Sequence, residues 1–214
     1  MPGFLFDLDG TLVDSVYQHV LAWQEALEAA GIELAVWRIH RRIGMSGGLL
    51  VNALLRETGR PVNSAEISRI QQLHTEAYRR LAPLVRVLPG ARELLSYLTK
   101  ACVPWAIATS GRLENARPAL ELLGIGPDVT VVTRDQVQHA KPDPDLFVAA
   151  AAQLGAELED AIVVLIKVSW VFAVLFHEVF DNGRLIPNEL RSTSPAKSQP
   201  INIKPLSHLS LIHI

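Results

Sequence analysis

The chain has 214 residues, of which 49% are hydrophobic and 20% charged, and its formal net charge is −2. A chain of this length can bury a substantial core, and its apolar content excludes a disordered tail protein. The nearly balanced charge argues against a general polyanion-binding surface, so we expect no nucleic acid among its partners.

Three features of the sequence bear on the cellular compartment of the protein and on whether it enters a membrane. Cys102 is the only cysteine, so no internal disulfide can form, and we expect it to be a small buried apolar residue. The first nine residues hold two carboxylates and no basic stretch, which is not typical of a signal peptide. The apolar run 161–176 includes Lys167 and is shorter than the roughly 18 residues of a membrane span. We therefore expect a cytoplasmic protein that does not enter the membrane.

Four short apolar runs have the composition of parallel strands that are buried on both faces. They are residues 3–8, 104–109, 129–133 and 161–166. Helix-period segments separate them, one opening at Pro89-Gly90 and two others ending at Gly124 and Gly155. This alternation predicts an α/β fold with a Rossmann-like parallel sheet.

Between Asp14 and Pro83 the sequence contains only helical patterns. The predicted helices are residues 15–30, a stretch around 37–43, 49–58 and 64–81. Asn63 is placed to cap the last of them, with Glu66 at its third position. We expect this all-helical insert, which directly follows strand one, to form a lid over the sheet.

Two carboxylates, Asp7 and Asp9, follow the first predicted strand, at the end where ligands collect in α/β sheets. At a spacing of two they point the same way in an extended chain, and Gly10 then lets the backbone turn sharply. Carboxylates this close repel unless a cation or a shared proton intervenes, and Mg²⁺ is the simplest such cation. Taken alone, the Asp9-Gly10 pair is also compatible with an ordinary turn.

The longer segment at residues 4–15, FLFDLDGTLVDS, resembles the first motif of the haloacid dehalogenase-like (HAD) hydrolases. It is similar to the group with a helical cap that contains phosphoglycolate phosphatase and β-phosphoglucomutase. The resemblance implies that Asp7 is the nucleophile that forms an aspartyl-phosphate and that Asp9 is the general acid and base. It also implies that the Asp7 carboxylate and the Asp9 backbone carbonyl bind Mg²⁺, and that Thr11 shapes the loop.

Two further segments resemble the second and third HAD motifs, in the family's order. Residues 108–111 (ATSG) end a predicted strand, and the resemblance implies that Thr109 binds the transferring phosphoryl group. Ser110 and Gly111 offer a hydroxyl and amides to an anion, although a serine or threonine before a helix can also be a plain N-cap. The segment 141–144 (KPDP) implies that Lys141 neutralises Asp7 and the phosphoryl oxygens.

We expect the substrate to be a small phosphorylated metabolite that the helical insert selects. Residues 43–48 (IGMSGG) resemble the cap loop that faces the active site in this group, and they are equally compatible with a helix–helix linker. The candidate substrate contacts are Gly10, Thr11, Arg41, Met45, Ser46, Ser110 and Gly111. His19, His40 and His74 lie on polar helical faces without metal-ligand spacing, and we interpret each as a surface residue.

The fourth HAD motif, a Gly-Asp pair followed by another aspartate that completes the Mg²⁺ shell, is absent after the strand at 161–164. The chain reads VLIKVSW at 164–170, and Asp160 falls at the opposite end of the strand. We interpret residues 167–214 as a tail outside the family, disordered or an artefact of an interrupted reading frame, and expect a core that is incomplete at its C-terminal side. Loss of the carboxylate predicts weaker metal binding and impaired activity.

The sequence therefore predicts a Rossmann-like HAD core at 1–13 and 84–166, a helical cap at 14–83 and a tail at 167–214. The predicted function is a Mg²⁺-dependent phosphatase of small organic phosphate monoesters. One alternative is a β-phosphoglucomutase-like phosphotransferase, and another is a non-catalytic or truncated fragment. The predicted catalytic residues are Asp7, Asp9, Thr109 and Lys141.

Overall fold

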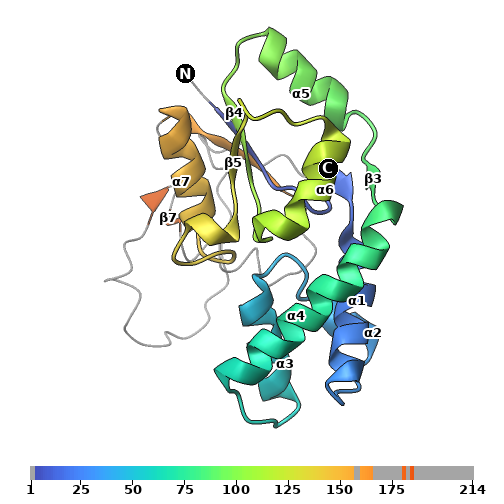
Figure 1. Cartoon of the computed structure of the whole chain (residues 1–214). Helices are drawn as coiled ribbons and strands as arrows, with labels where there is room; N and C mark the ends of the chain where they lie inside the picture. The colour runs from blue at the N-terminus through green and yellow to red at the C-terminus, as the bar shows by residue number, and fades with distance from the viewer. Residues whose placement is uncertain (1–2, 157–159, 166–179, 182–183, 186–214) are drawn as a thin grey trace, which may run out of the picture.

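The computed structural model describes residues 3–156, 160–165, 180–181 and 184–185. Figure 1 shows a sheet flanked by helices in the upper part and a group of four helices, α1 to α4, in the lower part. The predicted fold class, a Rossmann-like parallel sheet with an all-helical insert after strand one, is confirmed.

Four parallel strands form the main sheet, in the order β5-β4-β1-β6. Each lies within one of the predicted runs: β1 (Phe4–Phe6), β4 (Trp105–Ala108), β5 (Thr130–Val132) and β6 (Ile162–Val164). Phe4 pairs with Trp105 on one side and with Ile162 on the other, so β1 lies inside the described sheet. Because the strands are parallel, their carboxyl ends meet at one edge, where Asp7 and Thr109 follow β1 and β4.

Alternate side chains of the strands bury the sheet on both faces. Phe6 and Ile107 pack in one cluster with residues of α5 and α6, whereas Leu5 and Ala106 pack in another with residues of α7. This two-sided burial explains why the strands are continuously apolar. The three covering helices are α5 (Ala91–Lys100), α6 (Leu113–Leu123) and α7 (Asp145–Leu154).

The four helices of the insert share a core of their own, which includes Trp23, Leu54 and Ile70. As predicted, Asn63 caps the last helix: its side chain accepts a hydrogen bond from the Glu66 amide at 2.7 Å. The second helix is shorter than the predicted stretch because the chain turns after His40. The bounds are α1 (Val16–Ala29), α2 (Val36–His40), α3 (Gly47–Glu57) and α4 (Ser64–Leu81).

Several short elements have no signal in the sequence. A two-residue strand β2 (Val13–Asp14) pairs antiparallel with β3 (Arg86–Val87), where the chain leaves the sheet region for the helices and where it returns. Two residues are too few for a periodicity to show. The others are the 3₁₀ helices η1 (Ala82–Leu84) and η2 (Arg134–Gln136) and the antiparallel pair β7 (Phe180–Asp181) and β8 (Arg184–Leu185). Apart from these last four residues, the predicted tail at 167–214 lies outside the described residues.

The prediction that Cys102 is buried is wrong. The residue is exposed and has a positive φ of 52°. It follows the C-cap of α5, where its amide bonds to the Thr99 carbonyl at 3.1 Å and the Val103 amide bonds to the Leu98 carbonyl at 2.9 Å. This is the Schellman pattern, which places a left-handed residue just outside the helix.

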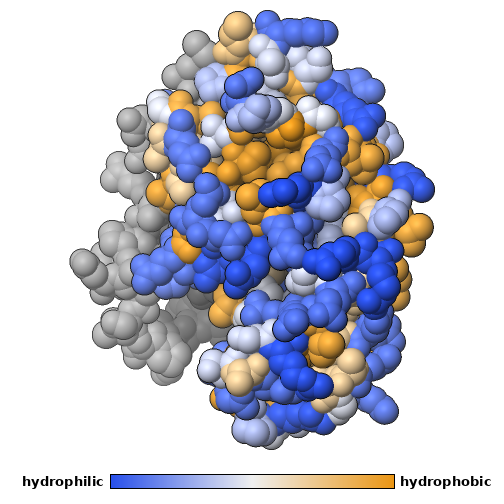
Figure 2. Space-filling view, in the orientation of Figure 1, coloured by the Kyte–Doolittle hydropathy of each residue, from blue (hydrophilic) through white to orange (hydrophobic). Residues whose placement is uncertain are grey.

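Polar residues cover most of the visible face around the junction between the sheet region and the helical insert, while apolar residues gather higher, over the sheet region (Figure 2). Among the described residues, no helix is long and apolar enough to cross a membrane.

Candidate active site

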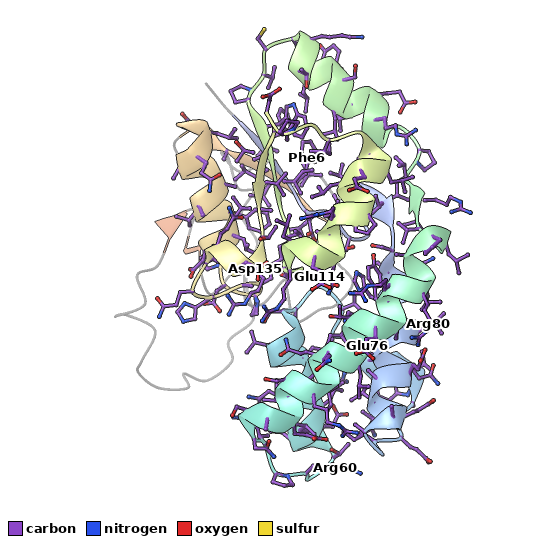
Figure 3. All side chains as sticks on the ribbon, viewed as in Figure 1. Phe6, Arg60, Glu76, Arg80, Glu114 and Asp135 are labelled. Carbon is purple, nitrogen blue, oxygen red and sulfur yellow. The ribbon has the colours of Figure 1, made fainter. Side chains whose placement is uncertain are left out.

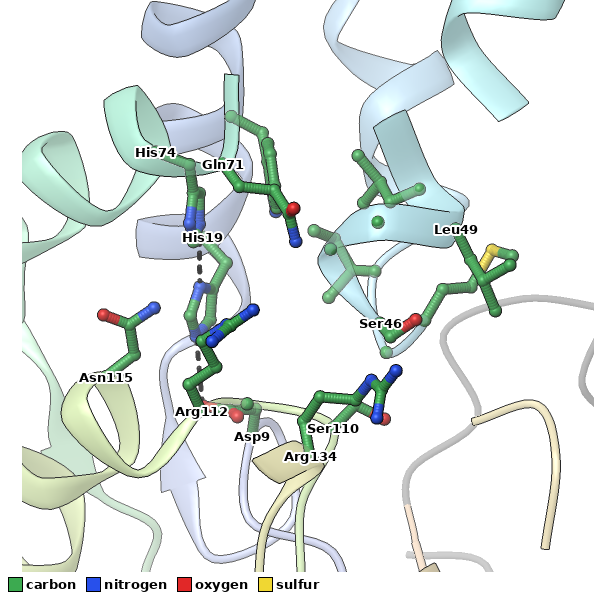
Figure 4. A pocket seen from close by; sticks show the side chains of 18 of the residues that line it. Asp9, His19, Ser46, Leu49, Gln71, His74, Ser110, Arg112, Asn115 and Arg134 are labelled. Carbon is green, nitrogen blue, oxygen red and sulfur yellow. Dashed lines mark hydrogen bonds and ion pairs between the residues drawn. The ribbon is translucent and has the colours of Figure 1, made fainter. Parts of the chain in front are cut away.

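A cavity of about 410 Å³ lies between the carboxyl ends of the strands and the helical insert. Its floor includes Asp7, Asp9 and the residues 109–111, which follow β1 and β4. Its opposite wall comes from α1, α4, the loop before α3 and the first residues of α3. Figure 4 shows Ser46 and Leu49 on one side of this space, with Asp9 and Ser110 on the other.

Asp7 and Lys141 form a buried ion pair below the cavity. Lys141 is 2% exposed, and its ammonium contacts Asp7 Oδ1 and donates to the Ala108 carbonyl at 2.9 Å. The Leu8 amide also donates to Asp7 Oδ1, at 2.8 Å, whereas Oδ2 has no hydrogen bond among the described residues. Burial raises the pKa of the Asp7 carboxyl, and the Lys141 charge opposes this rise. The pair therefore fixes the orientation of the buried Asp7 carboxyl, and the Lys141 ammonium offsets part of the cost of its negative charge.

The Asp9 carboxylate is held by groups from both parts of the molecule. Ser15 donates to its Oδ1 at 2.6 Å, and His19 Nε2 lies 3.2 Å from the same oxygen. Thr109 Oγ1 is 3.5 Å from Oδ2, at the limit of a hydrogen bond. Burial alone would raise the pKa of Asp9, but the charge of His19 and the hydrogen bonds from His19 and Ser15 outweigh it and lower the pKa to about 2.

The interpretation of His19 and His74 as surface residues is wrong, because α1 packs against α4 and encloses both rings. His74 is 5% exposed, its ring stacks on Trp23 at 3.8 Å between centroids, and its Nε2 lies 3.3 Å from His19 Nδ1. The His19 ring in turn stacks on Tyr78 at 4.0 Å between centroids. Burial, together with the charge of His19, lowers the pKa of His74 well below its ordinary value, so His74 is neutral near pH 7.

Thr109, Ser110 and Gly111 form a compact turn at the end of β4. Thr109 is 1% exposed, and its Oγ1 accepts a hydrogen bond from the Gly111 amide at 3.0 Å. The Ser110 hydroxyl is buried without a hydrogen-bond partner in the described part of the chain. All three residues line the cavity, and their binding of the phosphoryl group stays a prediction.

Several contacts tie the helical insert to the sheet region around the cavity. The Ser46 amide donates to the Lys141 carbonyl at 3.2 Å, and Asn115 Nδ2 donates to Thr75 Oγ1 at 3.3 Å. At the outer edge, Arg79 of α4 pairs with Glu114 of α6 at 2.6 Å; Figure 3 shows Glu114 on the side of α6 that faces α4. These contacts close the cavity on the α6 side and beside Lys141.

Not every predicted substrate contact reaches the cavity. Met45 and Ser46 line it, but Arg41 does not. The Arg41 side chain is 49% exposed, lies over the Trp37 ring and faces Glu57 at 3.9 Å. Gly10, with φ of 78°, and Thr11 form the turn after Asp9 and also lie outside the lining. Their amides bond to backbone carbonyls of residues 13 and 8.

Other lining residues have no motif that marks them. They come from helices that meet only in the folded chain, so their position depends on packing. His19 alone has a local signal, because it follows Ser15 by one helical turn and both side chains reach Asp9. The rest are Trp23, Leu49, Leu50, Asn52, Ile67, Gln71, His74, Thr75, Arg112, Asn115 and Arg134.

The comparisons with known proteins agree with this geometry. Residues 1–164 match the family model of haloacid dehalogenase-like hydrolases. The chain belongs to this family. By its family, this HAD-like hydrolase is a phosphoric monoester hydrolase.

Three similar proteins illustrate the range of relatives that the comparisons find. The HAD-like hydrolase is 34% identical over 164 residues to hexitol phosphatase A of Escherichia coli K12, covering 76% of this chain and 73% of that protein. It is 30% identical over 188 residues to the β-phosphoglucomutase of Bacillus subtilis 168, covering 81% of this chain and 82% of that protein. The crystal structure of a hydrolase from Pseudomonas syringae matches with a TM-score of 0.75 and 49% identity, covering 77% of this chain and 76% of that one.

Phosphatases and phosphomutases of this family generally use Mg²⁺. Within the described residues of the HAD-like hydrolase, no three His, Cys, Asp or Glu side chains gather as a metal site. The groups that could bind a metal here are oxygen ligands. They are the Asp7 carboxylate, whose Oδ2 has no partner among the described residues, and the backbone carbonyl of Asp9 beside it. Mg²⁺ is commonly held by one or two carboxylates together with water and phosphate oxygens. The residues therefore fit a Mg²⁺ whose shell the substrate and water complete.

Proposed function

We propose that the chain is a phosphatase of small organic phosphate monoesters that works through an aspartyl-phosphate on Asp7. One observation carries this proposal: the buried Asp7–Lys141 pair stands beside a second carboxylate, Asp9, at the floor of a cavity that the helical insert roofs. A paired nucleophile and a neighbouring acid-base group are the parts that covalent phosphoryl transfer needs.

In the first step, the Asp7 carboxylate attacks phosphorus, and the bond from phosphorus to the ester oxygen breaks. Lys141 offsets the negative charge that gathers on Asp7 and the phosphoryl oxygens. The Thr109 hydroxyl, which lies between the Gly111 amide and Asp9, is the candidate donor to a phosphoryl oxygen. A bound Mg²⁺ would be held by the Asp7 carboxylate and the Asp9 carbonyl and would supply further positive charge for the phosphoryl group.

Asp9 serves both proton transfers in the proposal. It gives a proton to the leaving alkoxide and then takes one from the water that attacks the aspartyl-phosphate, which releases inorganic phosphate. With a pKa of about 2, Asp9 is a carboxylate before substrate binds, as the second transfer requires. For the first transfer it takes up a proton as the substrate binds, which the phosphate charge favours. Ser15 and His19 hold the carboxylate in place.

We also propose a division of labour along the chain, with catalysis in the core at 1–13 and 84–166 and substrate selection in the cap at 14–83. The relatives include phosphatases named for hexitols, N-acetylmuramic acid 6-phosphate and phosphoglycolate, which supports a small phosphorylated metabolite as the substrate. Because the fourth motif is missing from the sequence, we propose that the metal is held weakly and that activity is impaired.

The test is phosphate release from p-nitrophenyl phosphate by the full chain, with added Mg²⁺ and with a chelator. We expect release that needs Mg²⁺ and that Asp7→Asn abolishes. Asp160→Asn, an exposed aspartate at the opposite end of β6, is the matched control and should keep the wild-type rate. A rate that Asp7→Asn leaves unchanged would refute the proposal and favour a non-catalytic fragment.

A phosphotransferase is the second candidate, favoured by the similarity to a β-phosphoglucomutase over most of both chains. A mutase uses the same residues but returns the phosphoryl group to the substrate instead of to water. Incubation with β-glucose 1-phosphate and a trace of the bisphosphate separates the two, since a mutase yields an isomeric sugar phosphate and a phosphatase yields free phosphate.

A further inference from the structure

A row of two imidazoles links the Asp9 carboxylate to the interior of the helical insert. His19 Nε2 lies 3.2 Å from Asp9 Oδ1, and His19 Nδ1 lies 3.3 Å from His74 Nε2. Figure 4 shows both contacts as dashed lines, from His74 on α4 through His19 on α1 to Asp9. In the proposed proton transfers His19 holds Asp9, whereas the contact between the two rings has no assigned role.

The stacking around His19 fixes the plane of its ring but not which nitrogen faces Asp9. The ring lies parallel to the Tyr78 ring, with 4.0 Å between centroids and 4° between planes. A half-turn about the Cβ–Cγ bond leaves that plane unchanged but exchanges Nδ1 with Cδ2 and Nε2 with Cε1. The half-turned ring presents carbon to both Asp9 and His74 and loses both hydrogen bonds. The hydrogen-bond partners at the two ends of the ring therefore select its orientation.

A neutral imidazole at position 74 suits His19 in either protonation state. An ionised carboxylate only accepts, so His19 serves Asp9 as a donor when its Nε2 carries hydrogen. If His19 is neutral, its Nδ1 is then an acceptor and His74 Nε2 donates to it; if His19 is protonated, its Nδ1 donates and His74 Nε2 accepts. The lowered pKa of His74 keeps it neutral near pH 7 and able to do both. The contact between the rings therefore persists in both states.

Packing holds His74 more firmly than it holds the two side chains that follow in the row. His74 is 5% exposed, and its ring stacks on Trp23 with 3.8 Å between centroids and 17° between planes, where α1 packs against α4. The side chains of His19 and Asp9 are 15% and 20% exposed. A side chain that is locked by packing can orient a less buried neighbour to which it is bonded. His74 is therefore the fixed end of the row.

We propose that His74 is a positioning residue for the acid-base chemistry, because it holds the His19 ring so that Nε2 donates to Asp9 and keeps that carboxyl group aimed at the leaving-group oxygen. His74 has no hydrogen bond to Asp9 among those of the described residues, and it acts through His19. The orientation of Asp9, which follows β1, then depends on two helices of the insert. This inference rests on the phosphatase function proposed above, since it assumes that Asp9 protonates the leaving group.

The decisive comparison uses two esters of nearly the same shape whose leaving groups differ in basicity. Phenyl phosphate releases a more basic oxygen than p-nitrophenyl phosphate, so its cleavage depends more on a proton from Asp9. In the full chain, His74→Phe keeps an aromatic ring against Trp23 but removes the nitrogen. We expect kcat/KM to fall roughly tenfold for phenyl phosphate, the effect of one hydrogen bond, and much less for p-nitrophenyl phosphate. His74→Gln, whose amide can donate and accept near the place of Nε2, should restore most of the loss.

The matched control is His40→Phe, the same change at another histidine of the insert. His40 stacks on Tyr17 with 5.5 Å between centroids and does not line the cavity, so both rates should stay at the wild-type value. Urea denaturation shows whether each variant is folded. Equal losses for the two esters in folded His74→Phe, which a packing role or a direct contact with the substrate would give, would overturn the inference. The absence of any loss would overturn it as well.

Nitrogen NMR of the histidine rings in the full-length wild-type chain, near pH 7, gives a readout that needs neither turnover nor a variant. We expect His19 Nε2 to carry hydrogen, and a scalar coupling across the hydrogen bond between His19 Nδ1 and His74 Nε2. A His19 Nε2 without hydrogen, or the absence of this coupling, would overturn the inference. If the wild-type chain releases no phosphate from either ester, the phosphatase function fails, and the spectra still decide whether His74 positions His19. They also decide it if His74→Phe does not fold.

Discussion

The floor of the cavity and its helical wall satisfy their polar groups in different ways. On the floor, the charged side chains Asp7, Asp9 and Lys141 are bonded within the chain before any substrate arrives, and among the described residues the Ser110 hydroxyl is the one group buried there without a partner. On the wall, the Ser46 hydroxyl and the first amides of α3 have no partner among the described residues. A group that is already bonded is oriented in advance, and an unbonded one gains most from a ligand. This difference supports the proposed division, with catalysis in the core and substrate selection in the insert.

Removing the Lys141 ammonium from the floor of the cavity should have the largest effect on stability and activity. In Lys141→Met, Asp7 remains a buried carboxylate without its counter-charge, which typically costs about 3–5 kcal/mol of stability. Phosphate release should fall below detection. Urea denaturation and the p-nitrophenyl phosphate assay measure the two effects.

The stability of the same variant, Lys141→Met, should also depend on pH. Burial already raises the pKa of Asp7, and loss of Lys141 removes the charge that opposes the rise. A raised pKa in the folded state gives stability that is present at low pH and lost as pH rises through that pKa. The stability of Lys141→Met should therefore fall between acidic and neutral pH. Lys100→Met, at the exposed end of α5, is the control; equal behaviour of the two variants would contradict the assignment.

The second largest effect should come from Asp9 and should depend on the leaving group. Asp9→Asn removes the proton donor, so kcat/KM for an alkyl phosphate should fall by about 10²–10⁴-fold. The loss should be much smaller for p-nitrophenyl phosphate, because nitrophenolate departs without a proton. Asp14→Asn, in the exposed position of β2, should change neither. Equal losses for both esters would argue that Asp9 acts structurally.

The sequence predicts the floor far better than the wall, for a physical reason. Asp7 and Asp9 are neighbours in a strand and its turn, and Thr109 and Lys141 follow other strands whose carboxyl ends meet them at one edge. The apolar runs and glycine punctuation determine that arrangement locally.

The wall depends on tertiary packing that no local pattern encodes. Arg41 belongs to the same loop region as Ser46, but its side chain turns to Glu57 instead of the cavity. His74 lies on a polar-looking face of α4, and it is buried only because α1 packs there. The two-residue strands β2 and β3 are likewise too short to be seen before the fold brings them together.

The burial of His74 between α1 and α4 can be tested through the pH dependence of stability, where we expect a moderate effect. Since its pKa is well below the ordinary 6.5, the unfolded chain binds a proton that the folded chain rejects. Its contribution to stability is present above pH 6.5 and is lost as pH falls, with a slope of up to about 1.4 kcal/mol per pH unit. His74→Phe keeps a ring against Trp23 and should remove this slope. Denaturation series from pH 7 to about pH 5 would show it, and identical slopes in the two proteins would refute the burial of a neutral imidazole.

The smallest effect should come from the outer ion pair that joins the insert to the core. Arg79 and Glu114 are 2.6 Å apart, with side chains 68% and 63% exposed, so water and salt screen their attraction. A double-mutant cycle with Arg79→Ala and Glu114→Ala should give a coupling of about 0.2–1 kcal/mol at low salt and less at high salt. Because the pair lies away from Asp7 and Asp9, the cycle should leave kcat for p-nitrophenyl phosphate nearly unchanged. A large change in kcat would mean that the position of the insert controls the floor as well as the wall, and the comparison between the two would then fail.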